Sequence, residues 1–263
     1  MVCRARMAAV PLVAVFLMSV AVAAPPHGDR PATPHAEPAP DARARTIAQA
    51  PTPRKPKGKA VTPRSWPELQ AGNRRFVAGD HLVHAVRELR AALATGQQPD
   101  VVVLTCSDSR VSPEWIFDQP LGELFVVRTA GHVVDPIALG SIEYAVEHLH
   151  ARLIVVMGHD ECGAVAAAVS GDSMPTEHLD SIMRKIRPGI PPARPGASRA
   201  ETLAAAVAAN VRRSATDVVI ASPVVREHVV HGSVEVIQAV YHLASGRVEE
   251  LRTPDALSGS EHD

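Results

Sequence analysis

Residues 101–110 read VVVLTCSDSR, and residues 153–163 read LIVVMGHDECG. In each stretch a run of aliphatic and β-branched residues leads directly into a polar segment that contains a cysteine. Uninterrupted apolar runs of this length are typical of parallel strands that are buried on both faces of a sheet. In open α/β sheets, the loops at the carboxyl ends of such strands converge on one place. The two stretches therefore predict an α/β fold with a functional site at adjacent strand ends.

The polar segments contain three side chains that suit a metal ion, Cys106, His159 and Cys162. Two thiolates and one imidazole form a ligand set that zinc accepts in tetrahedral geometry. Three protein ligands leave the fourth position open, which is typical of catalytic zinc, and water bound there has its pKa lowered to about 7. Taken singly, each cysteine could be a small core residue and the histidine a surface or satisfied core residue. Their shared placement at strand ends favours a zinc site.

Asp108 and Arg110 stand two positions apart after Cys106, so both side chains can face the same side of a loop. A guanidinium group can hold a carboxylate through two parallel hydrogen bonds. Held in this way, Asp108 could accept a hydrogen bond from zinc-bound hydroxide; released, it could become the fourth zinc ligand and close the site. The alternative is an ordinary exposed salt bridge, which contributes only about 0–1 kcal/mol. Proximity to the predicted metal favours the catalytic interpretation.

The first 24 residues have the pattern of an export signal. Arg4 and Arg6 give a positive start, residues 8–22 an apolar segment, and residues 21–23 a small-residue cleavage site. The apolar run is short for a membrane span, so we expect cleavage and no stable membrane span afterwards. A periplasmic or secreted location follows as an expectation.

Export raises the alternative of a disulfide, because two cysteines in an oxidising compartment commonly pair. Removal of residues 1–24 takes Cys3 with it and leaves Cys106 and Cys162. A bridge would not explain why His159 stands three residues before Cys162, nor why both thiols follow strands. We therefore expect the two cysteines to bind a metal.

The rest of the chain divides by composition. Residues 25–64 are rich in Pro and Ala without periodicity, which predicts a disordered linker. Its basic cluster at 54–59 could touch an anionic surface, or it could belong to a solvated spacer. The globular domain is expected over residues 65–252, and a flexible tail over residues 253–263.

Strand and helix patterns alternate along the globular region. Ser65 is the predicted N-cap of the first helix, which has Pro67 in its first turn. Further helices are predicted over 86–93, 137–149, from about 162, 176–186 and 199–213, and strands over 101–105, 124–128, 153–157, 233–241 and 248–251. Such alternation implies right-handed crossovers and a central, mostly parallel β-sheet flanked by helices.

The charge balance and the scarcity of aromatic residues limit the possible partners. The chain has 27 Lys plus Arg against 28 Asp plus Glu, and aromatic residues make up 3% of it. Nucleic-acid-binding proteins carry a basic footprint, which this composition lacks, and single-strand binders add aromatic stacking surfaces. We expect no nucleic-acid partner and a small or neutral substrate.

Five stretches together match one known family. They are CSDSRV at 106–111, FDQ at 117–119, FVVRTAG at 125–131, GSIEYAVEHL at 140–149 and GHDECGA at 158–164. With this set the chain resembles the β-class carbonic anhydrases, and the similarity runs from about Trp66 to Leu251. The resemblance implies zinc on Cys106, His159 and Cys162, and an Asp108–Arg110 dyad. It implies reversible hydration of carbon dioxide to bicarbonate and a proton, by attack of zinc-bound hydroxide.

The resemblance also implies a homodimer or a dimer of dimers, with active clefts at the subunit interface and N-terminal helices packed on the partner. Gln97 would donate a hydrogen bond to the substrate, although it could equally be a solvated loop amide. Phe125 and Gly163 would line the substrate pocket, although Phe125 could simply be a core residue. Val103 replaces the tryptophan of bicarbonate-inhibited members, which favours a constitutively open fourth zinc position.

His132 departs from the family pattern, which has an asparagine in its place after the Arg-Thr-Ala-Gly stretch. A histidine that titrates near neutral pH could relay protons. It could also fill the structural position of the asparagine, and we leave it out of the catalytic set for that reason.

Two other functions remain open on the sequence alone. Zinc-bound hydroxide attacks other small heterocumulenes, so the same fold could hydrolyse carbonyl sulfide or carbon disulfide. Alternatively, the domain could be a non-catalytic, zinc-stabilised module. The Asp108–Arg110 pair and Gln97 argue against the module, because structural zinc usually has four protein ligands and needs no substrate donor.

Overall fold

The computed structural model describes residues 65–82 and 84–251. The predicted export signal, linker and tail lie outside these residues. Among the described helices, none is both long and apolar enough to cross a lipid bilayer.

A five-stranded sheet forms the centre of the described region, with the strand order β2-β1-β3-β4-β5. The strands are β1 (Val101–Cys106), β2 (Leu124–Thr129), β3 (Leu153–His159), β4 (Glu235–Tyr241) and β5 (Val248–Glu250). Strands β1 to β4 pair in parallel, and β5 pairs antiparallel with β4. The predicted mostly parallel sheet is confirmed, including its short edge strand.

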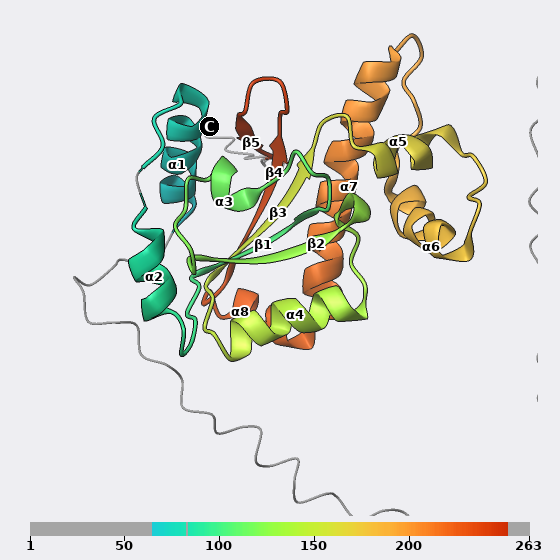
Figure 1. Ribbon diagram of the computed structural model, residues 1–263. Coiled ribbons are helices and arrows are strands. Elements are labelled where there is room, and N and C mark those ends of the chain that lie inside the picture. Colours follow the sequence, from blue (N-terminus) through green and yellow to red (C-terminus); the bar gives the residue numbers. More distant parts are fainter. Residues whose placement is uncertain (1–64, 83, 252–263) are drawn as a thin grey trace, which may run out of the picture. The chain divides into compact units, whose positions relative to one another are not determined.

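Helices cover both faces of this sheet (Figure 1). They are α1 (Trp66–Ala78), α2 (Val86–Ala92), α3 (Pro113–Ile116), α4 (Pro136–Glu147), α5 (Gly163–Ser170), α6 (Glu177–Ile186), α7 (Arg199–Ala221) and α8 (Pro223–Val230). Ser65 and Glu68 form a capping box at the start of α1, as the predicted N-cap requires. The predicted helical cover of the sheet is confirmed.

The last two helices differ from the prediction. Helix α7 continues to Ala221, eight residues beyond the predicted end at 213. Its last turns are rich in β-branched residues, which have low helix propensity, but Ala215 and Val218 are buried there, and packing outweighs propensity. Helix α8 was not predicted, although Ser222 caps it through a hydrogen bond from the Val225 N–H and Pro223 opens it.

Burial on both faces explains the apolar strands. In β1, Val102 and Leu104 pack in the larger core with α4, α5, α7 and α8, whereas Val101 and Val103 pack in the smaller core with α1 and α3. All six residues of β1 and all seven of β3 are buried. The chain can therefore expose its polar residues only after these strands end, which concentrates the chemistry at the carboxyl edge of the sheet.

Candidate metal centre

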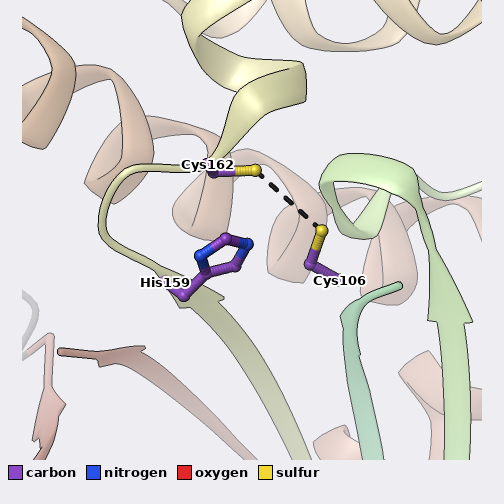
Figure 2. Close-up of side chains that lie close together, drawn as sticks. All are labelled: Cys106, His159 and Cys162. Atoms are coloured by element: carbon purple, nitrogen blue, oxygen red, sulfur yellow. Dashed lines mark hydrogen bonds between the residues drawn. The ribbon is translucent and has the colours of Figure 1, made fainter. Parts of the chain in front are cut away.

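The ends of β1 and β3 place the three predicted ligands together. Cys106 is the last residue of β1, and His159 is the last residue of the adjacent parallel strand β3. Cys162 follows at the N-cap of α5, after a turn in which Glu161 adopts a left-handed conformation (φ 50°). The ligand atoms of the three side chains lie within 4.8 Å of one another, and all three residues are buried (Figure 2).

The distance between the sulfur atoms separates a metal site from a disulfide. The Cys106 and Cys162 Sγ atoms lie 4.0 Å apart, and both cysteines are free. A disulfide bond is about 2.05 Å long. Two sulfur ligands at about 2.3 Å from a tetrahedral zinc lie about 3.8 Å apart. The observed spacing fits the metal site.

The His159 ring is oriented for a metal. Its Nδ1 donates to the backbone carbonyl of Asp160 at 2.8 Å, so its Nε2 must carry the lone pair. Nε2 is buried and has no hydrogen-bond partner among the described residues. An unsatisfied buried acceptor is costly, and histidine ligands of metals typically donate from the other nitrogen in this way. The residues present therefore fit a zinc ion.

The surroundings of the two thiols favour one thiolate even without a cation. A hydrogen bond from Cys162, helped by the Gly131 N–H at 3.3 Å, lowers the pKa of Cys106 below its usual value. The pKa of Cys162 is raised because its thiol donates to Cys106 and because it is buried. Gly131 has φ 66°, and a Cβ there would lie 2.8 Å from Ile186 Cδ1. Only glycine therefore brings this N–H to the sulfur without strain.

Asp108 and Arg110 form the predicted bidentate pair. Arg110 donates from Nε to Asp108 Oδ1 at 2.9 Å and from Nη2 to Oδ2 at 2.8 Å, and its backbone N–H donates to Oδ1 at 2.9 Å. These hydrogen bonds hold the pKa of Asp108 well below its usual range. Asp108 Oδ2 lies 3.9 Å from His159 Nε2. The carboxylate thus faces the metal position while Arg110 restrains it.

Arg128 fixes the loop between Cys106 and Asp108, a role that the sequence analysis missed. Its Nε donates to the Cys106 carbonyl at 3.1 Å, and its Nη2 donates to the Asp108 carbonyl at 2.6 Å. The only sequence signal was its place in the FVVRTAG stretch, because backbone contacts leave no spacing pattern.

The proton-relay hypothesis for His132 is wrong. This ring is fully buried, and its Nε2 lies 3.1 Å from Asn210 Nδ2, which can only donate. Burial lowers the pKa of His132 to about 4. A neutral ring without solvent contact cannot pass protons to buffer, so His132 fills a structural position.

We expect this histidine to make the fold acid-sensitive. The pKa of about 4 in the folded state lies below the ordinary histidine pKa of about 6.5, so between these values the unfolded chain binds more protons. Stability is therefore lost as pH falls through this window, by about 3 kcal/mol for the full shift. The free energy of unfolding can be measured with urea for the wild type and for His132→Asn, near pH 4 and near pH 6.5. Between these pH values the variant should lose less stability than the wild type, by the contribution of His132. An equal loss in both proteins would contradict the assignment.

The three predicted substrate residues differ in where they lie relative to the metal ligands. Gly163 is exposed beside Cys162, and among the described residues a Cβ on it would meet no atom within 4 Å. Gln97 is exposed in the loop before β1. Phe125 pairs with Val102 four residues before the strand end, about 13 Å along β2, where it lines a groove of about 310 Å³. Within one chain, only Gly163 is brought to the metal ligands.

Comparison with known proteins gives a consistent answer. The carbonic anhydrase family profile matches residues 101–248. A carbonic anhydrase of Mycolicibacterium smegmatis is 43% identical over 70% of this chain and 91% of its own length. Carbonic anhydrase 2 of Mycobacterium tuberculosis is 41% identical over 70% of this chain and 89% of its own length.

Solved structures agree with these relatives. The β-carbonic anhydrase of Coccomyxa, in complex with acetazolamide, is 29% identical with a TM-score of 0.57, over 72% of this chain and 87% of that one. A tetrameric β-carbonic anhydrase of Sordaria macrospora is 27% identical with a TM-score of 0.57, over 69% of this chain and 93% of that one. The profile match, the relatives and the fold together show that this chain belongs to the β-class carbonic anhydrase family.

Proposed function

We propose that this chain catalyses the zinc-dependent, reversible hydration of carbon dioxide to bicarbonate and a proton. The observation that carries the proposal is the cluster of Cys106, His159 and Cys162, with ligand atoms within 4.8 Å and a restrained carboxylate beside it. Relatives above 40% identity are named carbonic anhydrases, so the hydrolysis of carbonyl sulfide or carbon disulfide is not favoured. A non-catalytic module is not favoured either, since three ligands leave an open position.

Each residue has a distinct role in this proposal. Cys106, His159 and Cys162 would hold zinc, which supplies a Lewis acid that lowers the pKa of water in the open position. Asp108 lies 3.9 Å from His159 Nε2 and can accept a hydrogen bond from the attacking oxygen. Arg110 keeps both carboxylate oxygens engaged, which prevents Asp108 from moving to the metal.

The remaining substrate contacts are part of the same proposal. Gly163 leaves open space beside Cys162 for a small linear substrate. Gln97 and Phe125 would contribute from a partner subunit, because Phe125 lies about 13 Å along β2 from the strand end in its own chain. The site would then be completed at an interface between two copies.

Stopped-flow assays of zinc-loaded protein with carbon dioxide and with carbonyl sulfide test the proposal. We expect rapid hydration of carbon dioxide near neutral pH and little turnover of carbonyl sulfide. Preference for carbonyl sulfide would reassign the substrate. If zinc is bound and neither compound is consumed, the domain is a structural module.

A homodimer, or a dimer of dimers, is the proposed assembly. Strand β2 is at the edge of the sheet, and an unpaired strand edge is a template for association. Beside it, Ile137 and Tyr144 of α4 are 79% and 48% exposed, and Ile137 lines the same groove as Phe125. Exposed apolar side chains next to an open strand edge favour a second copy at this face. Solved relatives include tetramers.

An acidic substitution on this face should separate the subunits. Ile137→Asp places a charge in an apolar interface, so the mass measured by light scattering should fall to that of one chain, with a weaker carbon dioxide turnover. Ile220→Asp, at a comparably exposed isoleucine of α7, is the matched control and should leave the assembly unchanged. An unchanged mass for Ile137→Asp would place the interface elsewhere.

Export to the periplasm or the medium is also proposed, on the pattern of residues 1–24. A mature protein that begins near residue 25, recovered outside the cytoplasm, is the expected result of fractionation and N-terminal sequencing. An unprocessed chain in the cytoplasm would refute it.

A further inference from the structure

The side chains of Asp160, His242 and Glu249 form a line that begins at the residue after His159 and ends at the surface. His242, just after β4, has its Nδ1 3.4 Å from Asp160 Oδ2 and its Nε2 3.2 Å from Glu249 Oε2. Asp160 directly follows His159, and Glu249 lies on β5. The exposed fractions of the side chains are 33% for Asp160, 37% for His242 and 68% for Glu249. Exposure therefore increases along the line from Asp160 to Glu249.

Asp160 is held firmly at the inner end of this line. Its backbone N–H donates to the Tyr241 carbonyl at 3.1 Å, and its Oδ1 accepts from the Leu243 N–H at 2.9 Å. Its carbonyl accepts from His159 Nδ1 at 2.8 Å. One residue thus connects the metal-binding end of β3 to the start of the β4–β5 hairpin, which lies beside β3 in Figure 1. The second carboxylate oxygen is left to orient the His242 ring.

The ring of His242 is arranged to gain and lose a proton in place. Each nitrogen faces a carboxylate, but a neutral imidazole has only one N–H to donate. Only the doubly protonated ring can donate to both Asp160 and Glu249. The neutral ring can keep either contact, so proton uptake and release need no large movement of the ring.

We propose that His242 relays protons between the active site and solution, an inference that rests on the proposed carbon dioxide hydration. Each turnover forms one bicarbonate and releases one proton. That proton passes through water to Nδ1, on the side of Asp160, and gives the imidazolium ion. The Nε2 proton then leaves to a buffer base beside the exposed Glu249, and the ring is neutral again. Proton uptake and release leave the ring between the two carboxylates, and a separate half-turn of the partly buried ring afterwards restores the starting tautomer.

Among the described residues, no other titratable group near this line can take the place of His242 as the proton relay. Histidine is the side chain whose ordinary pKa lies in the range in which buffers exchange protons at neutral pH. Tyr241, beside it, has its pKa raised by burial and by the charge of Asp160. Arg110 has its pKa raised, chiefly by Asp108, and Asp160 adds to this effect. Arg247 meets His242 through the backbone, where its carbonyl accepts from the His242 backbone N–H at 2.8 Å and leaves the ring nitrogens free of it. His132 is fully buried. Among these groups, only His242 is an imidazole that contacts solvent and has a carboxylate beside each ring nitrogen.

Buffer dependence of turnover by the zinc-loaded full chain tests the relay. His242→Gln should lower kcat roughly tenfold at low buffer concentration, leave kcat/KM for carbon dioxide unchanged, and recover with imidazole buffer. His228→Gln is the matched control, because His228 is a surface histidine that contacts Glu147 at 3.1 Å and lies on α8. It should behave as the wild type does. A merely structural role for His242 would instead lower stability or zinc content without any buffer dependence.

A spectroscopic measurement gives an independent readout. In the zinc-loaded wild type, ¹⁵N NMR should show the His242 ring gaining a proton over the pH range in which low-buffer turnover declines. The relay is excluded if the ring keeps one protonation state across that range, or if His242→Gln shows wild-type buffer dependence. If the wild type hydrates no carbon dioxide at all, the failure lies with the proposed function and not with the relay.

Discussion

Replacement of His159 by asparagine should strip the protein of zinc and lower carbon dioxide hydration by more than about a thousandfold, or roughly 4 kcal/mol of transition-state stabilisation. His159 supplies the one nitrogen ligand, and its Nε2 is buried without another partner among the described residues. Asparagine is shorter and cannot place a comparable donor atom there. Two thiolates alone leave zinc two ligands short of the tetrahedral set. Zinc affinity and carbon dioxide hydration should therefore be lost together.

Zinc content by atomic emission, measured beside stopped-flow turnover, checks this result. His132→Asn is the matched control, because His132 is equally buried and close by, yet it bonds to Asn210 and not to the sulfur cluster. Asparagine also tolerates the left-handed backbone of that position, where φ is 45°. The control should keep its zinc and its activity at neutral pH. A His159→Asn protein that retains one zinc per chain and near-normal turnover would overturn the assignment of the metal centre.

Most of the fold could be predicted from the sequence, because its two central strands have an uninterrupted apolar pattern. A strand that is buried on both faces must be apolar at every position, and β1 and β3 are. Their carboxyl ends are then fixed by the first polar residues, which here are the candidate ligands. Helix α8 was missed because its start depends on one Ser-Pro step and its length on packing, which leaves no strong periodicity.

The site was predictable only where side chains act in a local pattern. The Cys106, His159 and Cys162 cluster and the Asp108–Arg110 pair are short motifs after strands. Contacts between distant segments left no such signal. Arg128 acts on backbone carbonyls of another strand, and His242 meets Asp160 across 82 positions of the chain, by way of the sheet register. The placement of Phe125 away from the ligands likewise follows from register, which a single strand sequence does not contain.

The second large effect is expected from Arg110→Ala, which should lower turnover near neutral pH by roughly a hundredfold while zinc stays bound. The substitution removes the two side-chain hydrogen bonds at 2.9 and 2.8 Å that restrain Asp108. The freed carboxylate is 3.9 Å from His159 Nε2 and can move onto the metal in place of water. Activity should recover as the pH rises, because hydroxide then competes with the carboxylate. Turnover against pH, together with the visible spectrum of the cobalt-substituted protein, would detect the added ligand.

Protonation of Asp108 cannot account for this loss, which makes the result diagnostic. The pKa of Asp108 is held below its usual range by Arg110, and without Arg110 it returns toward the ordinary value for aspartate, about 3.9. The carboxylate is therefore ionised at neutral pH in both proteins, and only its position differs. Adding Asp108→Asn to Arg110→Ala removes the competing ligand, so the double variant should be slow at every pH without recovery at high pH. Arg213→Ala, which breaks a comparable surface pair with Asp217 on α7, should change neither quantity. If the single and double variants share one pH profile, Arg110 acts through charge on the substrate and not by restraining Asp108.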